Sequence, residues 1–209
     1  MDYFPIVTCL MGNQLPCACY FLIMLAAAET EVHPFYPLNE FYDKSGIPIP
    51  RVVQVDGEQV PEPYRSLLVH KNDMTPTLES TYGAGVALRV MEFDLSGDVL
   101  SRRILLFAEG REKPVVFGSI KIYLDRFPEL ARQQVVEQRL PLGAILRGQA
   151  IIHSACPSAF FKVKADAVIN RALGLNGEAV LYGRRNVLSD SSNRTLAQVI
   201  EILPPSETQ

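Results

Sequence analysis

Two charged side chains stand inside stretches of the sequence that are otherwise apolar and rich in strand-forming residues. In the first stretch, the alternation of side chains along a strand puts Arg102 on the same face as Leu100 and Ile104. In the second stretch, Glu201 shares its face with Val199. An unpaired charge on an apolar face is costly to desolvate, so each of the two charges needs a partner.

Arg102 and Glu201 admit two interpretations. In the first, they form a structural ion pair with each other, or each lies at a sheet edge, and the pattern by itself favours this. In the second, they line a pocket in which the guanidinium group binds a ligand carboxylate and the glutamate acts as an acid, a base or a hydrogen-bond acceptor.

Other side chains that could bind a metal or act as nucleophiles are scattered. Cys17 and Cys19 lack the two-residue spacer of zinc ribbons and redox motifs, and no histidine lies at a ligand spacing from another. The sequence contains no phosphate-binding loop, dinucleotide fingerprint or nucleophile elbow. We therefore expect no metal and no cofactor, with thiols that stay reduced in the cytoplasm.

Composition is typical of a folded domain. The 209 residues are 48% hydrophobic and 21% charged, enough for one domain with a core. The net charge is −3 and the basic clusters are no longer than pairs, so we expect no nucleic-acid partner. A small molecule is the expected partner, and the oligomeric state stays open.

The N-terminal part divides into two predicted segments. Residues 1–32 form an apolar extension, in which the apolar run 15–28 is shorter than the roughly 20 residues that span a bilayer. We expect no membrane span. The extension is a weak signal peptide, an apolar helix packed on the domain, or the product of an over-extended start with Met24 as the true first residue. Residues 33–66 are a proline-rich preface with one short strand at 51–55.

Strands must position Arg102 and Glu201. Alternating or fully apolar runs joined by short polar or glycine-containing links predict strands at 86–93, 99–108, 115–123, 150–153, 160–163, 179–188 and 195–203. Helix-forming runs predict helices at 128–138, from 141 to 147 and at 166–173, with a turn of helix at Thr75. The expected fold is α+β, with a single antiparallel sheet and helices packed on one side.

Five short segments, in order, resemble the chorismate pyruvate-lyase family. Each is short, and the order makes the resemblance specific. It extends from about residue 67 to residue 204, and its segments are 70–75, 101–110, 141–143, 182–185 and 200–204.

The resemblance implies a chorismate lyase-like domain at 67–205 and a carbon–oxygen lyase that converts chorismate, or a close relative, into 4-hydroxybenzoate and pyruvate. Carried over residue by residue, Arg102 binds a substrate carboxylate and Glu201 is the acid/base. Met74 and Leu142 contact the substrate through their backbones. Arg184 is better explained as support for the sheet than as a ligand contact.

The sequence also departs from the family. Residues 165–178 form an insertion near the expected pocket, and Ile200 replaces a threonine of the short bacterial lyases. Two alternatives to catalysis therefore stay open. The same fold serves in bacterial transcription regulators as an effector-sensing domain whose pocket senses a small ligand, so this chain could be a non-catalytic domain that binds a small aromatic acid. The fold could also be kept in an interaction or structural protein that has lost the chemistry.

Overall fold

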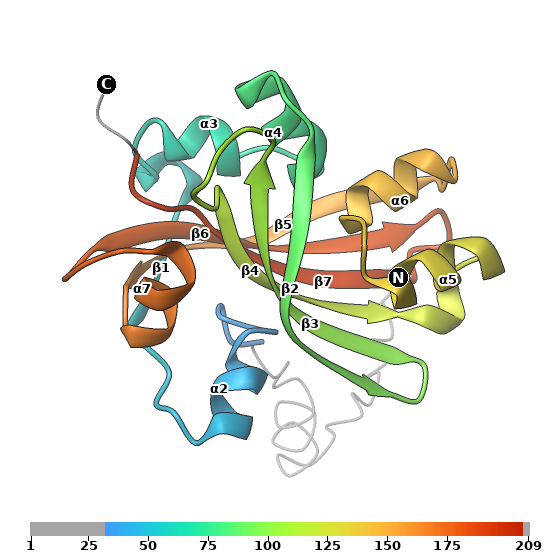
Figure 1. The fold of residues 1–209 in the computed structure, drawn as a ribbon, viewed down its shortest axis with the longest axis horizontal. Helices are drawn as coiled ribbons and strands as arrows, with labels where there is room; N and C mark the ends of the chain where they lie inside the picture. Colours follow the sequence, from blue (N-terminus) through green and yellow to red (C-terminus); the bar gives the residue numbers. More distant parts are fainter. Residues whose placement is uncertain (1–31, 207–209) are drawn as a thin grey trace, which may run out of the picture. The chain divides into compact units, whose positions relative to one another are not determined.

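The alternating stretches of the sequence pair into a seven-stranded sheet in a computed structural model that describes residues 32–206 (Figure 1). The order across the sheet is β1-β5-β6-β7-β4-β3-β2, and every neighbouring pair is antiparallel. The strands are β1 (Val52–Val55), β2 (Val86–Ser96), β3 (Val99–Ala108), β4 (Val116–Tyr123), β5 (His153–Lys164), β6 (Val180–Asp190) and β7 (Thr195–Ile202). The predicted α+β class with one antiparallel sheet is confirmed.

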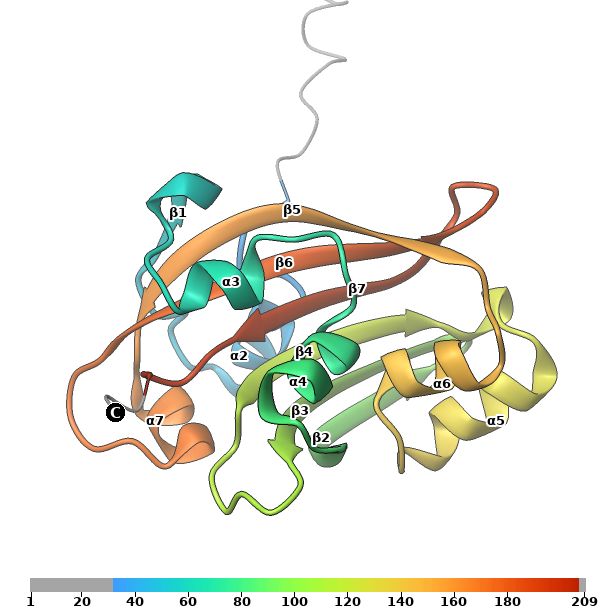
Figure 2. The same cartoon turned by 90° about the horizontal axis from the view of Figure 1, so that it is seen from above.

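Four helices cover the face of the sheet that carries Arg102. They are α3 (Tyr64–Leu68), α4 (Met74–Tyr82), α5 (Glu129–Glu137) and α6 (Leu142–Gly148). Leu78 of α4 is buried with Ile104 and Leu106 of β3, whereas Leu146 of α6 is buried with Ile120 of β4. Figure 2 shows α4 between α3 and α6. This face therefore has the predicted layer of helices, and apolar burial is the main force that holds the layer in place.

Two further helices, α2 (Asn39–Ser45) and α7 (Ala167–Leu173), pack on the other face of the sheet. Phe35, in the turn before α2, makes an edge-on contact with Phe161 of β5 at 5.9 Å between ring centroids. Ile169 of α7 is buried in the same cluster, together with Phe117 of β4 and Ile200 of β7. The insertion at residues 165–178 contains α7. It therefore packs against the face of the sheet opposite to the face that carries Arg102.

The region predicted as two short strands, 150–153 and 160–163, is one continuous strand, β5, with a register shift between Pro157 and Ala159. The two-strand prediction was wrong because it treated the proline as an end to the strand. A proline is tolerated where its missing N–H faces no partner strand. The outer neighbour β1 pairs only with residues 160–163 of β5, so Pro157 lies on an unpaired edge.

The N-terminal predictions fall mostly on residues that the structure does not describe. The apolar run 15–28 and Met24 lie outside the described residues, as do Cys17 and Cys19. Within residues 32–206, no helix is both long enough and apolar enough to cross a bilayer.

Candidate functional site

The register of the strands decides which side chains meet under α4 and α6. One row across the sheet contains one residue from each of four strands: Arg102, Ile120, Val199 and Asn186. The neighbouring row on the same face contains Ile104, Gly118, Glu201 and Arg184. Arg102 and Glu201 therefore share a face, but they lie in different rows, and β4 separates their strands.

Arg102 is buried with most of its hydrogen-bonding capacity unused. Only 1% of the residue is exposed. Its Nη2 donates to the carbonyl oxygen of Leu140 at 3.3 Å, while Nε and Nη1 are buried and have no hydrogen-bond partner within the described part of the chain. Desolvation lowers the pKa of Arg102 to about 10, so the group is a cation at neutral pH. An uncompensated buried cation of this kind is suited to binding an anion.

Glu201 is not the partner of Arg102. Its Oε2 accepts a hydrogen bond from Nε of Arg184 at 2.5 Å, and both side chains are buried. The prediction that Arg102 and Glu201 form a mutual ion pair is therefore wrong. The reason is topological: the hairpin of β6 and β7 places Arg184 directly opposite Glu201.

Arg184 also attaches the segment between α3 and α4 to the sheet. Its Nη1 donates to the carbonyl oxygens of Leu68 and His70, each at 3.1 Å, and its Nη2 donates to the carbonyl oxygen of Asn72 at 3.2 Å. Burial lowers the pKa of His70, and the charge of Arg184 lowers it further, so the imidazole is neutral at neutral pH. These bonds hold the segment that leads into α4 against the sheet.

Met74 and Leu142 are the first residues of α4 and α6, and both line the same cavity as Arg102. Helix α4 begins after Asp73, whose side chain does not cap the first amides of the helix. The side chain of Asp73 instead points to β5, where its Oδ2 lies 2.8 Å from Nε2 of His153. The other ring nitrogen of His153, Nδ1, lies 2.9 Å from the carbonyl oxygen of Ile151.

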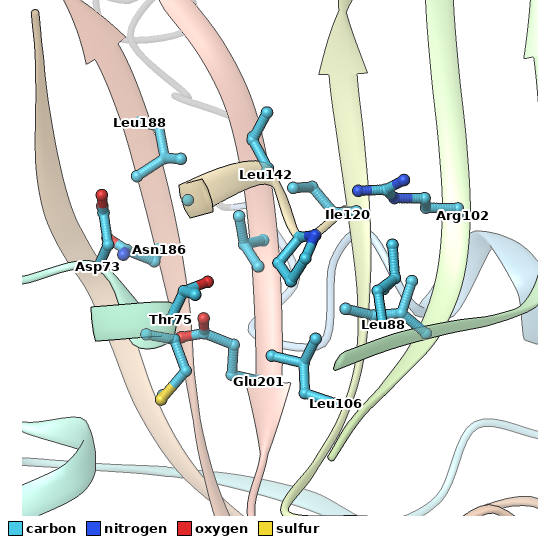
Figure 3. A pocket seen from close by; sticks show the side chains of 15 residues that line it. Asp73, Thr75, Leu88, Arg102, Leu106, Ile120, Leu142, Asn186, Leu188 and Glu201 are labelled. Carbon is cyan, nitrogen blue, oxygen red and sulfur yellow. The ribbon is translucent and has the colours of Figure 1, made fainter. Parts of the chain in front are cut away.

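The cavity is enclosed by the sheet on one side and by the starts of α4 and α6 on the other. Its volume is about 60 Å³, which is room for a few water molecules at roughly 10–15 Å³ each, compared with about 150 Å³ for a cavity that holds benzene. Its walls are largely apolar, with Leu88, Ile120 and Leu188 among them. Figure 3 shows Arg102 on one side of the cavity, and Asp73 and Asn186 on the other.

All four predicted site residues, Arg102, Glu201, Met74 and Leu142, line this cavity. Their roles as ligand contacts stay predictions.

Sequence reasoning missed three polar residues of the site. Asp73 appeared only within the segment 70–75 of the family resemblance, His153 only as a histidine far from any other ligand, and Asn186 was not considered. A signal for Asn186 was present, because alternation along β6 puts Arg184, Asn186 and Leu188 on one face. The approach of His153 to Asp73 joins residues that are 80 positions apart, and no local pattern indicates it.

No protein-family model and no curated protein matches the sequence. Solved structures do match the fold. The effector domain of PhnF from Mycobacterium smegmatis aligns with 66% of this chain and 91% of its own length, at a TM-score of 0.51 and 15% identity. A structure of PhnF from the same organism aligns with 91% of this chain and 95% of its own, with the same TM-score and identity. The described part of this chain therefore shares the fold of the PhnF effector domain.

The prediction of a carbon–oxygen lyase is wrong. The structures that this chain resembles in fold are regulators and their effector domains, which are typically non-catalytic. The geometry offers a physical reason as well, because Arg184 engages the carboxylate that was expected to transfer a proton. The resemblance in sequence therefore extends to the fold and not to the chorismate lyase reaction.

Proposed function

We propose that this chain binds a small organic anion at Arg102 and releases it chemically unchanged, as an effector-sensing domain does. The ligand is a carboxylic acid of the aromatic or pre-aromatic class, or an acid of similar size. The proposal keeps the carboxylate-binding role predicted for Arg102 and replaces catalysis by reversible binding.

The observation that carries the proposal is the isolation of the Arg102 charge. Two of its nitrogen atoms are buried and have no hydrogen-bond partner in residues 32–206, although buried donors are normally bonded. The second arginine on this face, Arg184, is paired with Glu201 and bonded to three carbonyl groups. An anionic ligand would supply the charge and the acceptors that Arg102 lacks.

The shape of the site supports binding of a small molecule. The cavity has apolar walls with a few polar groups, an arrangement typical of ligand sites. Met74 and Leu142, at the starts of α4 and α6, stay predicted contacts to the ligand through their backbones. The fold shared with the effector domain of PhnF also supports a sensing role, although identity of 15% transfers no ligand.

Calorimetric titration of the full chain with benzoate and 4-hydroxybenzoate tests the proposal. We expect binding to the unmodified protein and a loss of at least 100-fold in affinity for Arg102→Met, because the only uncompensated cation of the cavity wall is removed. Arg103→Met is the matched control, since Arg103 lies on the opposite face of β3 and pairs with Glu92 at 3.0 Å. The ligand should be recovered unchanged. Equal affinities for the two variants would contradict the proposal.

A further inference from the structure

We infer that the cavity has a second recognition site at the end opposite Arg102, where Asp73 and Asn186 accept a hydrogen bond from the ligand. The inference rests on the proposed function and deepens it. It assigns the ligand to a narrower class, namely small monoanionic acids that carry an uncharged hydrogen-bond donor, a hydroxyl or an amide, at their far end.

Two unused acceptors are the basis of the inference. Oδ1 of Asp73 and Oδ1 of Asn186 are both buried, and neither has a hydrogen-bond partner in the described part of the chain. Asn186 is 2% exposed, and both residues line the cavity. Figure 3 shows both on the side of the cavity opposite to Arg102. Buried acceptors are normally satisfied, so a ligand that brings a donor to this end gains bonds that the protein alone does not make.

His153 positions Asp73 for this role. The carbonyl oxygen of Ile151 only accepts hydrogen bonds, so Nδ1 of His153, 2.9 Å away, carries a proton. For both contacts of His153 to be hydrogen bonds, a second proton must lie between its Nε2 and Oδ2 of Asp73, which are 2.8 Å apart. Whichever atom carries this proton, the pair of side chains is neutral overall. His153 thereby fixes one oxygen of Asp73 and leaves the other, Oδ1, to the cavity.

The charges around the cavity specify a monoanion. Three ionisable residues line it: Asp73, Arg102 and Glu201. The charge of Asp73 is offset in its pair with His153, and that of Glu201 is offset by Arg184. Arg102 is the remaining charge of this lining, so one negative charge on the ligand neutralises the site. A second negative charge next to the Asp73 carboxylate would be repelled.

The row that joins the two ends limits the length of the ligand. Arg102 and Asn186 lie three strand spacings apart, with Ile120 and Val199 between them. This corresponds to about 14 Å between the two Cα atoms. Because the arginine side chain occupies much of this span, the remaining length limits the ligand to at most a single ring or a short carbon chain. The far-end site is distinct from the backbone amides predicted at Met74 and Leu142, since a backbone N–H donates, whereas the Oδ1 atoms of Asp73 and Asn186 accept.

Matched pairs of acids test the inference in calorimetric titrations of the full chain. One pair is 4-hydroxybenzoate and 4-fluorobenzoate, and the other is 5-hydroxypentanoate and pentanoate. For the unmodified protein we expect the hydroxyl-bearing acid of at least one pair to bind about tenfold more tightly than its partner. Asn186→Leu should reduce this ratio to nearly one and still bind the parent acid, because Arg102 is untouched. Terephthalate, a dianion, should bind more weakly than benzoate.

Asn39→Leu is the matched control, since Oδ1 of Asn39 is also buried without a partner in the described residues but belongs to α2, on the other face of the sheet. The control should keep the tenfold ratio.

A third variant, His153→Leu, tests the positioning role of His153. Without the imidazole, the negative charge of Asp73 is no longer offset, so the variant should prefer 4-(aminomethyl)benzoate, which carries an ammonium group, over 4-hydroxybenzoate. A loss of stability alone would not reverse this preference.

The two proposals fail in different ways. If hydroxylated and parent acids bind equally well to the unmodified protein, or if Asn186→Leu keeps the ratio, the second recognition site is wrong and anion binding at Arg102 stands. If none of the acids binds, the proposed function fails as well.

Discussion

Arg102 illustrates how a single residue can oppose stability and support binding. Its burial lowers the pKa from its ordinary value to about 10, a shift that corresponds to roughly 3 kcal/mol against the charged form. One of its five N–H groups donates to the carbonyl oxygen of Leu140, whereas Nε and Nη1 have no acceptor in the described residues. Hydrogen bonds within the protein therefore offset little of the desolvation cost. A buried arginine with unused donors is best explained by a bound anion that the protein itself does not supply.

Replacing Arg102 should therefore stabilise the protein without ligand. We expect Arg102→Met to raise the free energy of unfolding by about 1–3 kcal/mol, because an apolar side chain of similar length removes the desolvation cost. Urea denaturation monitored by circular dichroism measures the change, and Arg103→Met serves again as the control. A marked loss of stability would show that the guanidinium group supports the fold rather than a ligand.

The lowered pKa of Arg102 also predicts a pH dependence. A carboxylate ligand stays charged above pH 6, so affinity depends on the fraction of Arg102 that is protonated. Affinity for benzoate, whose carboxylate is its one ionisable group, should be constant from pH 7 to pH 9 and then fall about tenfold per unit above pH 10. In the protein without ligand, the folded pKa lies below the unfolded value, so the unfolded chain binds more protons between pH 10 and 12.5 and this group's contribution to stability rises with pH there. A fall in affinity below pH 9 in the titrations would assign the anion to another group.

At the scale of elements, the buried pair of Arg184 and Glu201 connects β6, β7 and the segment before α4. Arg184 reaches three carbonyl groups of that segment, so the position of the start of α4 depends on a side chain of the sheet. On the outer side, α4 and α6 are joined by an exposed ion pair between Glu79 and Arg147 at 2.7 Å. Breaking the buried pair is expected to lower the free energy of unfolding much more than breaking the exposed pair.

Removing one member of the buried pair should be severe. Arg184→Met leaves the carboxylate of Glu201 buried and unpaired, and we expect a loss of about 3–5 kcal/mol in the free energy of unfolding. The double variant Arg184→Met with Glu201→Leu should recover part of that loss. Arg147→Ala, at the exposed pair, should cost at most about 1 kcal/mol. Chemical denaturation of the four proteins provides the comparison, and equal effects of Arg184→Met and Arg147→Ala would contradict it.

At the scale of the whole molecule, the segment predicted as a separate proline-rich preface contributes to the core. Phe35 and Leu38 are fully buried, and Tyr42 is nearly so, in the cluster on the face opposite to the cavity. The strand β1 extends the sheet beside β5. The proposed division at residue 67 stays a prediction, but these contacts indicate that residues 33–66 and the sheet fold together.

Truncation measures this dependence. A chain that begins at residue 33 should unfold cooperatively on heating, whereas a chain that begins at residue 67 should lose cooperative unfolding, because it lacks Phe35, Leu38 and β1. In the longer chain, Phe35→Ala should cost about 3–5 kcal/mol. Differential scanning calorimetry follows all three proteins. A cooperative transition in the chain from residue 67 would show that the preface is dispensable.

Much of the fold could be predicted because its signals are local. The helix predicted at 128–138 is α5 (Glu129–Glu137), and the one predicted at 166–173 is α7 (Ala167–Leu173). Alternation also placed Arg102 with Leu100 and Ile104, and Glu201 with Val199, each on one face of its own strand, since side chains along a strand alternate with a period of two. The limits of β5 were missed. Whether Pro157 ends the strand depends on whether another strand pairs with its outer edge, and β1 does not extend that far along β5.

The sequence by itself determined that two charges lie on an apolar sheet face and that each needs a partner. Only the tertiary structure decided the partners: Arg184 faces Glu201 across a hairpin, and Arg102 is left with unused donors at the cavity. The acceptors of Asp73 and Asn186 at the opposite end come from a loop and a strand more than 100 residues apart. The physical reason is that alternation within a strand is a local property, whereas the pairing of charges depends on register between strands and on long-range packing.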